Sequence, residues 1–205
     1  APDHEFDGVV VAIKTSEIIV EEGVIVSDAG VKLSEVLLTA SANSLSGLEW
    51  AVGIPGTIGG AIRGNAGAYG KDMAASVKKI EAWIDGEAKE LSATECGFGY
   101  RTSIFKERGG IILRVWIKLA PSADRREIAQ KMQDIIAKRD NKIPKEPSAG
   151  SFFKNIRIGD WPGDLPKNLP EQFIERGMIP AGWLIEEAGL KELSSGGAAI
   201  SGSHG

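Results

Sequence analysis

Glycine recurs at close spacing in one nearly uncharged stretch of this sequence. Seven glycines fall among the eighteen residues from Gly53 to Gly70, where Arg63 alone carries a formal charge. Glycine loses more conformational freedom on folding than other residues, so such a run suits a main chain that turns sharply or approaches a ligand closely. The run predicts a binding surface made of backbone, for a large cofactor with phosphate groups.

The segment Gly56–Ala61 follows Pro55, and this pattern predicts the start of a helix. The first amides of a helix have no partner within it, so they can donate to a phosphate, and Thr57 adds a hydroxyl group. No two glycines of the run stand in G-x-G spacing, and Lys71 is followed by Asp72 rather than Ser or Thr. A Rossmann or P-loop site is therefore disfavoured. A series of ordinary tight turns stays open as an alternative.

Two further stretches combine polar groups with aromatic rings. Gly97–Phe105 places Arg101 between aromatic residues and beside two hydroxyl groups, and its alternative reading is a surface arginine on a loop. Gly150–Asn155 places Ser151 before two phenylalanines, a lysine and an amide, and its alternative reading is a buried strand with a hydrogen-bonded serine. The two histidines stand near the ends of the chain, so no Ser-His-Asp arrangement can make Ser151 a nucleophile. Proton transfer is the more natural role for Ser151.

Hydrophobic periodicity indicates the elements that position these stretches. β-branched residues and alternation predict strands, and apolar residues three and four apart predict helices. Asp85–Gly86 is typical of a two-residue hairpin turn. The order of elements fits a mixed α/β or α+β chain. The predicted strands are 9–13, 18–21, 24–27, 77–84, 87–91 and 111–119, and the predicted helices are 33–42, 122–138 and 181–190.

Two of the predicted helices carry an apolar face. Asp124 and Glu127 stand in capping-box spacing at the start of the helix at 122–138. We expect its apolar stripe to pack in the core, and we expect three residues of the helix at 181–190 to point inward. The stripe consists of Ile128, Met132, Ile135 and Ile136, and the three inward residues are Trp183, Leu184 and Ala188.

Composition sets broad limits on function. With 205 residues and 42% hydrophobic content, the chain can bury a full core in one large or two small domains. A net charge of −4 without a basic block predicts no nucleic-acid partner, and no apolar run is long enough to span a membrane. One cysteine, Cys96, excludes an intrachain disulfide, and no Cys or His pair has the spacing of a metal site. These features predict a soluble protein of the cytoplasm.

The motifs together resemble the UDP-N-acetylenolpyruvoylglucosamine reductases, also called MurB. The resemblance covers the sequence from about Phe6 to His204. It implies an α+β fold with a PCMH-type FAD-binding domain over residues 1–120 and a smaller α+β substrate-binding domain over residues 121–205. Five motifs in the family's order carry the resemblance: Gly47–Ala61, Asn65–Gly70, Gly97–Phe105, Pro147–Asn155 and Ala181–Lys191.

The resemblance implies a two-step hydride transfer in peptidoglycan precursor synthesis. NADPH would be the hydride donor and FAD the carrier, and UDP-N-acetylglucosamine enolpyruvate would be reduced to UDP-N-acetylmuramate by a protein that is monomeric at full length. Arg101 would stabilise the enolate, as a fixed guanidinium can in a dry pocket, and Ser151 would donate the proton. Substrate would contact Tyr69, Lys142 and Asn155. The FAD-binding residues would be Ile54, Pro55, Gly56, Thr57, Gly59, Gly60, Asn65, Ala66 and Gly67.

The sequence also departs from the family pattern. Ile156 stands where the family has proline, and the last residues before His204 differ from the usual Ser-Glu-Lys. The family has a preceding β-rich segment with a Gly-Ser-Asn turn and a following segment with a catalytic glutamate, so we expect this sequence to be truncated at both ends. Two alternatives follow, which are a non-catalytic or degenerate flavin-binding fragment and another FAD oxidoreductase of the same superfamily.

Overall fold

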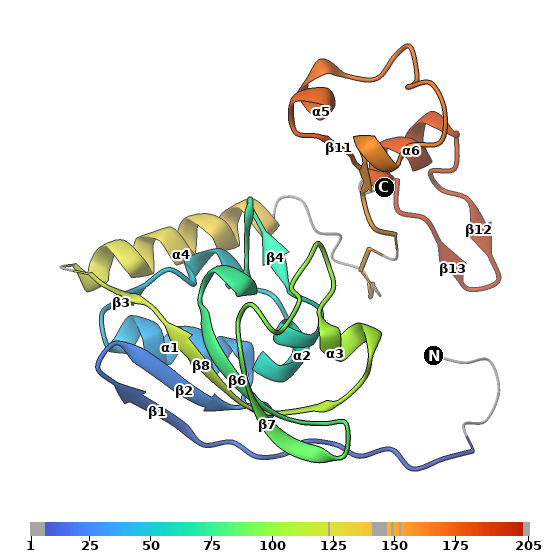
Figure 1. Ribbon diagram of the computed structural model, residues 1–205. Coiled ribbons are helices and arrows are strands. Elements are labelled where there is room, and N and C mark those ends of the chain that lie inside the picture. Colours follow the sequence, from blue (N-terminus) through green and yellow to red (C-terminus); the bar gives the residue numbers. More distant parts are fainter. Residues whose placement is uncertain (1–6, 123, 141–146, 149, 152, 203–205) are drawn as a thin grey trace. The chain divides into compact units, whose positions relative to one another are not determined.

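The chain contains both helices and strands and divides into two compact units (Figure 1). The computed structural model describes residues 7–122, 124–140, 147–148, 150–151 and 153–202. Unit 1 is Ala1–Ala137 and unit 2 is Lys138–Gly205. The α+β class predicted from the sequence is confirmed. The domain boundary predicted between residues 120 and 121 stays a prediction.

Unit 1 is organised around an antiparallel sheet, which has five strands in the described residues, in the order β1-β2-β8-β6-β7. Asp85 and Gly86 join β6 to β7 with φ of 55° and 84°, as a two-residue hairpin turn of this hand requires. The five strands agree with the predicted ones to within one residue. Their bounds are β1 Ile18–Glu21, β2 Val24–Asp28, β6 Val77–Ile84, β7 Glu87–Ser92 and β8 Ile111–Lys118.

The strand predicted at residues 9–13 is wrong. This segment forms no regular element, and Val9, Val10 and Val11 are 87%, 82% and 69% exposed. β-branched residues favour a strand only where a neighbouring strand supplies hydrogen bonds, and no described strand pairs with this segment. Further along the chain, Glu17 is bound to the end of β2. Its amide donates to the Asp28 carboxylate, and its carbonyl accepts from the Asp28 amide.

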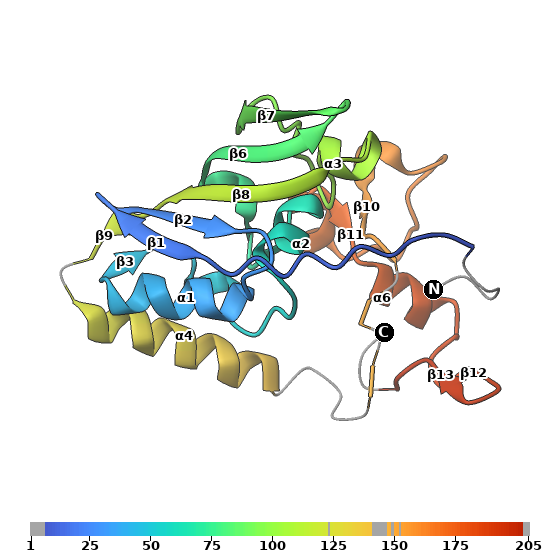
Figure 2. The same cartoon turned by 90° about the horizontal axis from the view of Figure 1, so that it is seen from below.

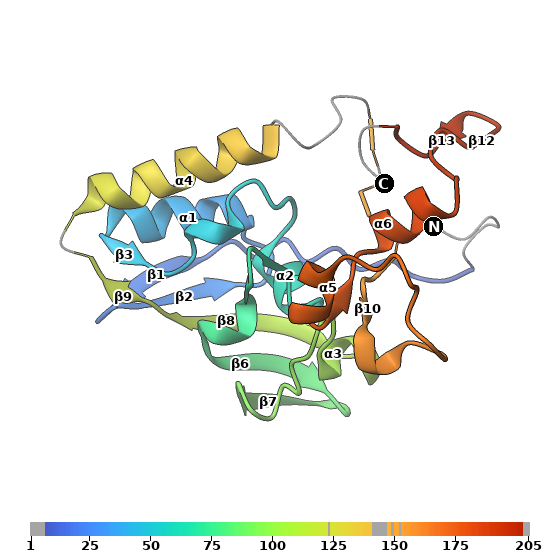
Figure 3. The ribbon, with the colours of Figure 1, turned by 90° about the horizontal axis from the view of Figure 1, so that it is seen from above.

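Helices α1 and α4 supply part of the core of unit 1, and Figures 2 and 3 show them running alongside each other. Helix α1 (Leu33–Ala42) has the predicted bounds and buries Leu33, Val36, Leu37 and Ala40. Helix α4 is Arg125–Asp140, and the Asp124 carboxylate accepts a hydrogen bond of 2.8 Å from the Arg126 amide.

The stripe predicted for α4 is correct at three of its four positions. Ile128 is buried, and Met132 and Ile135 pack against the core. Ile136 is 41% exposed, so its predicted burial is wrong. At 100° per residue it lies about 80° around the helix from Ile128, at the margin of the buried face.

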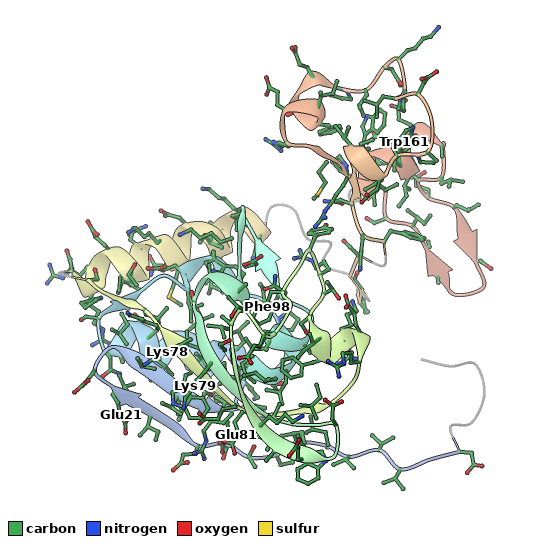
Figure 4. The ribbon with its side chains drawn as sticks, viewed as in Figure 1. Glu21, Lys78, Lys79, Glu81, Phe98 and Trp161 are labelled. Atoms are coloured by element: carbon green, nitrogen blue, oxygen red, sulfur yellow. The ribbon has the colours of Figure 1, made fainter. Side chains whose placement is uncertain are left out.

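The opposite faces of the sheet differ in chemistry. One face packs against a core whose fully buried side chains include Ile25, Ile80, Phe105 and Ile117. On β6, Lys78, Lys79 and Glu81 are among the labelled side chains of Figure 4. The Lys79 ammonium lies 4.2 Å from the centroid of the Trp116 ring and 2.6 Å from Glu90. The Lys79 ammonium thus interacts with both the face of the Trp116 ring and the Glu90 carboxylate.

Short elements connect the sheet and the helices of unit 1. Each is too short for its periodicity to be read from the sequence, and several contain the candidate residues. They are β3 Leu45–Ser46, η1 Glu49–Ala51, α2 Ile58–Arg63, β4 Gly67–Ala68, β5 Lys71–Asp72, η2 Met73–Ala75, α3 Ile104–Glu107 and β9 Ala120–Pro121.

Unit 2 contains shorter elements and little buried surface. Among its described hydrophobic residues, only Ile179 is fully buried, while the Phe173 and Trp183 rings meet edge to face at 5.9 Å. Trp161, labelled in Figure 4, donates from its indole nitrogen to the Asp164 carbonyl. The elements are β10 Ile156–Arg157, η3 Ile158–Asp160, α5 Glu171–Glu175, β11 Met178–Ile179, α6 Ala181–Glu187, β12 Ser194–Ser195 and β13 Ala198–Ala199.

The helix predicted at 181–190 is shorter than expected, because α6 ends at Glu187. Trp183 and Leu184 are half-buried, as an inward orientation requires. Ala188 is exposed and follows the last helical residue, so its predicted inward packing is wrong. Gly189, with φ of 66°, comes next, and a left-handed glycine is a common way to end a helix.

Candidate functional site

The glycine run begins as an exposed loop and continues as α2. Gly56 has φ of 103°, a conformation that favours glycine, and its carbonyl accepts a hydrogen bond of 3.0 Å from the Leu33 amide. Thr57 precedes the helix, and its hydroxyl accepts a hydrogen bond of 3.2 Å from the Gly60 amide. The predicted helix start at this point is confirmed, and Thr57 is its cap.

The first amides of α2 are already used inside the protein. Ile58 donates to the Val31 carbonyl at 2.9 Å, Gly59 donates to the Ala29 carbonyl at 3.0 Å, and Gly60 donates to Thr57. The expectation that these amides are free for a phosphate is therefore wrong. The loop before the helix differs, because the Gly56 and Thr57 amides donate no hydrogen bond to any part of the chain that the structure describes. Backbone donors for an anion lie just before the helix.

Two open pockets border this loop. One, of about 440 Å³, is lined by the loop and by two residues at the start of α1. Its lining consists of Lys32, Ser34, Gly53, Ile54, Pro55, Gly56 and Thr57. The other, of about 260 Å³, has a mostly apolar lining that includes Ile13, Ala29, Gly60, Arg63 and Ile112. Thr57 lines both pockets, and the four predicted cofactor residues Ile54, Pro55, Gly56 and Thr57 all line the larger one.

Close packing explains two of the glycines. A Cβ on Gly59 would lie 2.8 Å from the Ala29 side chain, and a Cβ on Gly67 would lie 2.7 Å from the Lys71 carbonyl. Gly59 is buried, and it lets α2 approach the end of β2. Gly60 is exposed and could carry a side chain without a clash. Close packing therefore requires glycine at positions 59 and 67 but not at position 60. The sequence pattern does not reveal this difference.

Asn65 is 1% exposed and is fully engaged in hydrogen bonds. Its side-chain amide donates to the Asp72 carboxylate and to the Gly99 carbonyl, each at 3.0 Å. Its side-chain oxygen accepts from the Ala74 amide at 3.0 Å. The neighbouring Ala66 uses its amide and its carbonyl in backbone bonds within unit 1. The side chain of Asn65 therefore has no donor left for a cofactor.

Tyr69 lies at the tip of the β4–β5 hairpin. Tyr69 and Gly70 have φ of 54° and 75°, which matches a two-residue turn with two left-handed residues. The Tyr69 side chain is 54% exposed. The hairpin therefore holds the Tyr69 ring at the surface of unit 1.

Arg101 lies in a tight turn and points back at the glycine run. Gly99 and Thr102 close the turn with two backbone hydrogen bonds of 3.1 and 3.3 Å. Arg101 has φ of 58°, which is uncommon for a residue with a Cβ. Its guanidinium donates to the Gly67 carbonyl at 2.7 Å and lies 5.3 Å from the centroid of the Tyr100 ring. These contacts and the half-buried side chain disfavour the alternative of a surface arginine on an ordinary loop.

Three hydrogen bonds join this turn to the glycine run. The Ser103 hydroxyl, which is fully buried, donates to the Arg63 carbonyl at 2.7 Å. The other two are the bond from Asn65 to Gly99 and the bond from Arg101 to Gly67. Sequence reasoning missed Ser103 and Asp72 as supports of the site. No local pattern indicates them, because each acts through a partner that folding brings close.

Two further groups near these motifs have shifted pKa values. Burial raises the pKa of the Cys96 thiol to about 11, with a smaller contribution from Glu95. Burial alone would also raise the pKa of Glu49, but hydrogen bonds from Ser46 and Gly47 and the charge of Lys131 lower it overall. Cys96 is therefore an unreactive core residue, and Glu49 is a buried carboxylate that anchors the start of the glycine-rich motif.

Unit 2 contains the remaining candidates. Ser151 is exposed and lies in no helix or strand, next to Gly150 with φ of 78°. The side-chain oxygen of Asn155 accepts a hydrogen bond of 3.1 Å from the Ala181 amide, so Asn155 supports the start of α6. Lys142 lies outside the described residues. The buried strand considered as an alternative for Gly150–Asn155 is not formed by its described residues.

No described helix has the length and hydropathy needed to cross a bilayer. The described His, Cys, Asp and Glu side chains form no cluster of three or more that could hold a metal ion.

Comparison with known proteins identifies the family. Residues 2–91 match the family described as FAD binding domain, which includes the whole glycine run. Residues 142–205 match the C-terminal domain of UDP-N-acetylenolpyruvoylglucosamine reductase. The chain belongs to the UDP-N-acetylenolpyruvoylglucosamine reductase family. The predicted family and the predicted FAD-binding domain are thus confirmed.

Individual proteins with this name match most of this chain. The reductase of Caldanaerobacter subterraneus is 40% identical over 96% of this chain and 59% of its own length. That of Pseudothermotoga lettingae is 38% identical over 100% of this chain and 65% of its own length. A crystal structure of MurB from Thermus caldophilus matches with a TM-score of 0.68 at 37% identity, over 86% of this chain and 58% of that one. The chain spans about three fifths of the length of these relatives.

Proposed function

We propose that this chain binds FAD and reduces UDP-N-acetylglucosamine enolpyruvate to UDP-N-acetylmuramate with NADPH as the hydride donor. The observation that supports this best is the attachment of Arg101 to the glycine run. Its guanidinium lies 2.7 Å from the Gly67 carbonyl, within the region that matches an FAD binding domain. A permanent cation beside a cofactor surface suits a reaction that develops negative charge on its substrate.

The described residues of unit 1 fit a flat cofactor with phosphate groups. The Gly56 and Thr57 amides are donors without a partner in the described chain, and they border a pocket to which Lys32 adds a positive charge. The apolar pocket on the other side of Thr57 can hold a ring. Successive backbone amides and a cation bind phosphate, and an apolar hollow excludes water from a ring system. Bound FAD would supply the hydride at this site.

Arg101 would act on the substrate's developing charge. Hydride addition to the enolpyruvyl carbon leaves an enolate, whose negative oxygen is stabilised by a fixed guanidinium. One nitrogen of the guanidinium is held by Gly67, which leaves other N–H groups for the enolate. The left-handed backbone of Arg101 fixes the direction of the side chain at a cost of about 1–3 kcal/mol.

Ser151 would donate the proton that completes the reaction. A serine hydroxyl has a pKa far above neutrality, so it gives up its proton only to a strong base, and the enolate carbon is such a base. Tyr69, Lys142 and Asn155 stay predictions as substrate contacts. The cytoplasmic location, the monomeric state and the truncation of the sequence at both ends also stay predictions.

Purified chain tests the proposal in two steps. FAD should bind and colour the protein yellow, NADPH should bleach the bound flavin, and only the enolpyruvyl UDP-sugar should restore the colour. Bleaching that molecular oxygen alone reverses would favour another flavin oxidoreductase. Protein that binds FAD but is never bleached would be a flavin-binding fragment without turnover, and protein that stays colourless would contradict the proposal for this chain.

Single variants separate the two catalytic roles. Arg101→Ala should slow the return of colour by about a hundredfold to a thousandfold, the range seen when one group that stabilises a developing oxyanion is lost. Ser151→Ala should slow the same step and leave bleaching by NADPH unchanged. Ser194→Ala, at an exposed serine on β12 of the same unit, is the control for Ser151. An equal loss in both steps for Ser151→Ala would contradict its role as the proton donor.

A further inference from the structure

Asn65 connects two loops that are distant in the sequence. Its side-chain amide donates one hydrogen bond to Asp72, on the β4–β5 hairpin, and one to the Gly99 carbonyl, in the turn that holds Arg101. Its oxygen accepts from the Ala74 amide. An asparagine side chain has two N–H donors, and both are used. Asn65 is 1% exposed, so water does not compete for these bonds.

The turn that holds Arg101 needs support from outside itself. Arg101 is left-handed at φ of 58°, and two backbone bonds between Gly99 and Thr102 are the turn's own closure. A side chain with a Cβ adopts this conformation only when its surroundings hold it there. Asn65 binds the first residue of the turn, and the Gly67 carbonyl binds the guanidinium. Asn65 thus holds the backbone of the turn, and the Gly67 carbonyl holds the Arg101 side chain.

We infer that Asn65 is a positioning residue for Arg101, acting through Gly99, and not a contact of the cofactor. The Asn65 bond fixes the turn, the turn fixes the Arg101 backbone, and Gly67 fixes the guanidinium. Asp72 orients the Asn65 amide, since it accepts the second donor. The importance of this arrangement for catalysis rests on the proposed function, whereas the arrangement itself can be tested without it.

The test compares variants that remove the Asn65 bond in different ways. Asn65 has φ of 41°, so Asn65→Gly deletes the side chain without straining the backbone. Asn65→Asp keeps an acceptor for Ala74 but loses both donors, and its carboxylate repels that of Asp72, so it breaks the same two bonds in a different way. Glu49→Gln is the matched control, because Glu49 is also buried in unit 1 and bonds Ser46 and Gly47 instead of the Arg101 turn.

The measurement is the exchange of the Arg101 guanidinium protons with water, followed by NMR of nitrogen-labelled arginine side chains. The signal is assigned by its loss in Arg101→Lys. We expect the Arg101 guanidinium protons to exchange about tenfold faster in Asn65→Gly and Asn65→Asp than in the parent chain. In Glu49→Gln, compared under conditions where the variants have equal thermal stability, we expect their exchange to be unchanged. Unchanged exchange in both Asn65 variants, or equal acceleration in the control, would overturn the positioning role.

The same variants separate this inference from the proposed function. In chain loaded with FAD, Asn65→Gly should slow return of the flavin colour on adding the enolpyruvyl UDP-sugar and leave bleaching by NADPH unchanged. Faster guanidinium exchange with an unchanged colour return would support the positioning role and contradict the catalytic role of Arg101. If Asn65→Gly and Asn65→Asp lose FAD binding while the exchange of the Arg101 guanidinium protons is unchanged, Asn65 is instead a contact of the cofactor.

Discussion

The two units of this chain hold their candidate residues in different ways. In unit 1, Arg101 is fixed by hydrogen bonds to the glycine run, and the supports of that turn, Asn65 and Ser103, are almost completely buried. In unit 2, Ser151 is exposed outside any regular element, and Asn155 uses its side-chain oxygen to support α6. The difference follows the amount of core, since only Ile179 is fully buried among the described hydrophobic residues of unit 2.

The precision with which a side chain is held in a site depends on buried support. A hydrogen bond inside a packed core competes with little water and therefore fixes a direction. A residue on an exposed segment can sample several directions until a ligand orders it. We therefore expect unit 1 to present its charged group in a fixed geometry, and unit 2 to contribute a more adaptable group.

The largest contrast should come from two phenylalanines that lie near the candidate residues. Phe105 is fully buried and Phe153 is 69% exposed. Phe105→Ala should lower the free energy of unfolding by about 3–5 kcal/mol, because it leaves a cavity in the core. Phe153→Ala should change it by less than about 0.5 kcal/mol. Chemical denaturation followed by circular dichroism measures both, and similar losses would contradict the difference in core between the two units.

Thiol labelling should separate the units next. Cys96 is the only cysteine of the sequence, is completely buried and has its pKa raised to about 11 by burial. A rise of two pKa units cuts the reactive thiolate by about a hundredfold at mildly alkaline pH, and burial slows the reagent further. Ser195→Cys, on exposed β12, should react at the rate of a free thiol. Rapid labelling of native Cys96 would show that unit 1 opens readily.

The acid stability of unit 1 should depend on Glu49. Its pKa is lower in the folded protein than the ordinary value of 4.5. A carboxyl group with a lowered folded pKa stabilises the fold above its unfolded pKa, and this contribution disappears as the pH falls through the folded pKa. Glu49→Gln should therefore cost about 1–2 kcal/mol near neutral pH and progressively less below pH 4.5.

Urea unfolding at several pH values measures this effect. Glu175→Gln, an exposed residue on α5, is the control in unit 2 and should stay within about 0.5 kcal/mol of the parent chain. A cost for Glu49→Gln that grows on acidification would contradict the sign of the pKa shift.

The smallest effect concerns two helix supports. Thr57 accepts a bond at the start of α2 and Asn155 accepts one at the start of α6. Each alanine substitution should cost about 1 kcal/mol. Amide hydrogen exchange should nevertheless accelerate more in α6, because Ile58 and Gly59 of α2 keep their bonds to unit 1. Equal acceleration in both helices would indicate that the core of unit 1 adds no local protection.

The sequence predicted elements whose pattern is local. Helix α1 and strands β1 and β6 have the predicted bounds, and the Asp85–Gly86 hairpin formed as expected. The strand at residues 9–13 failed because local preference cannot supply a pairing partner. Apart from the start of α2, the short elements around the candidate site were not predicted, since so few residues contain too little periodicity to indicate their structure.

The sequence was sufficient to predict the family of this chain, because the order of several motifs along the chain is visible without a structure. It also identified the glycine run and Arg101 as chemically important. The fold was needed to show which backbone amides are free, why Gly59 is a glycine and what the Asn65 side chain does. Each of these answers is a contact between segments that are distant along the chain, such as Asn65 and Gly99, and local preferences do not specify such a contact.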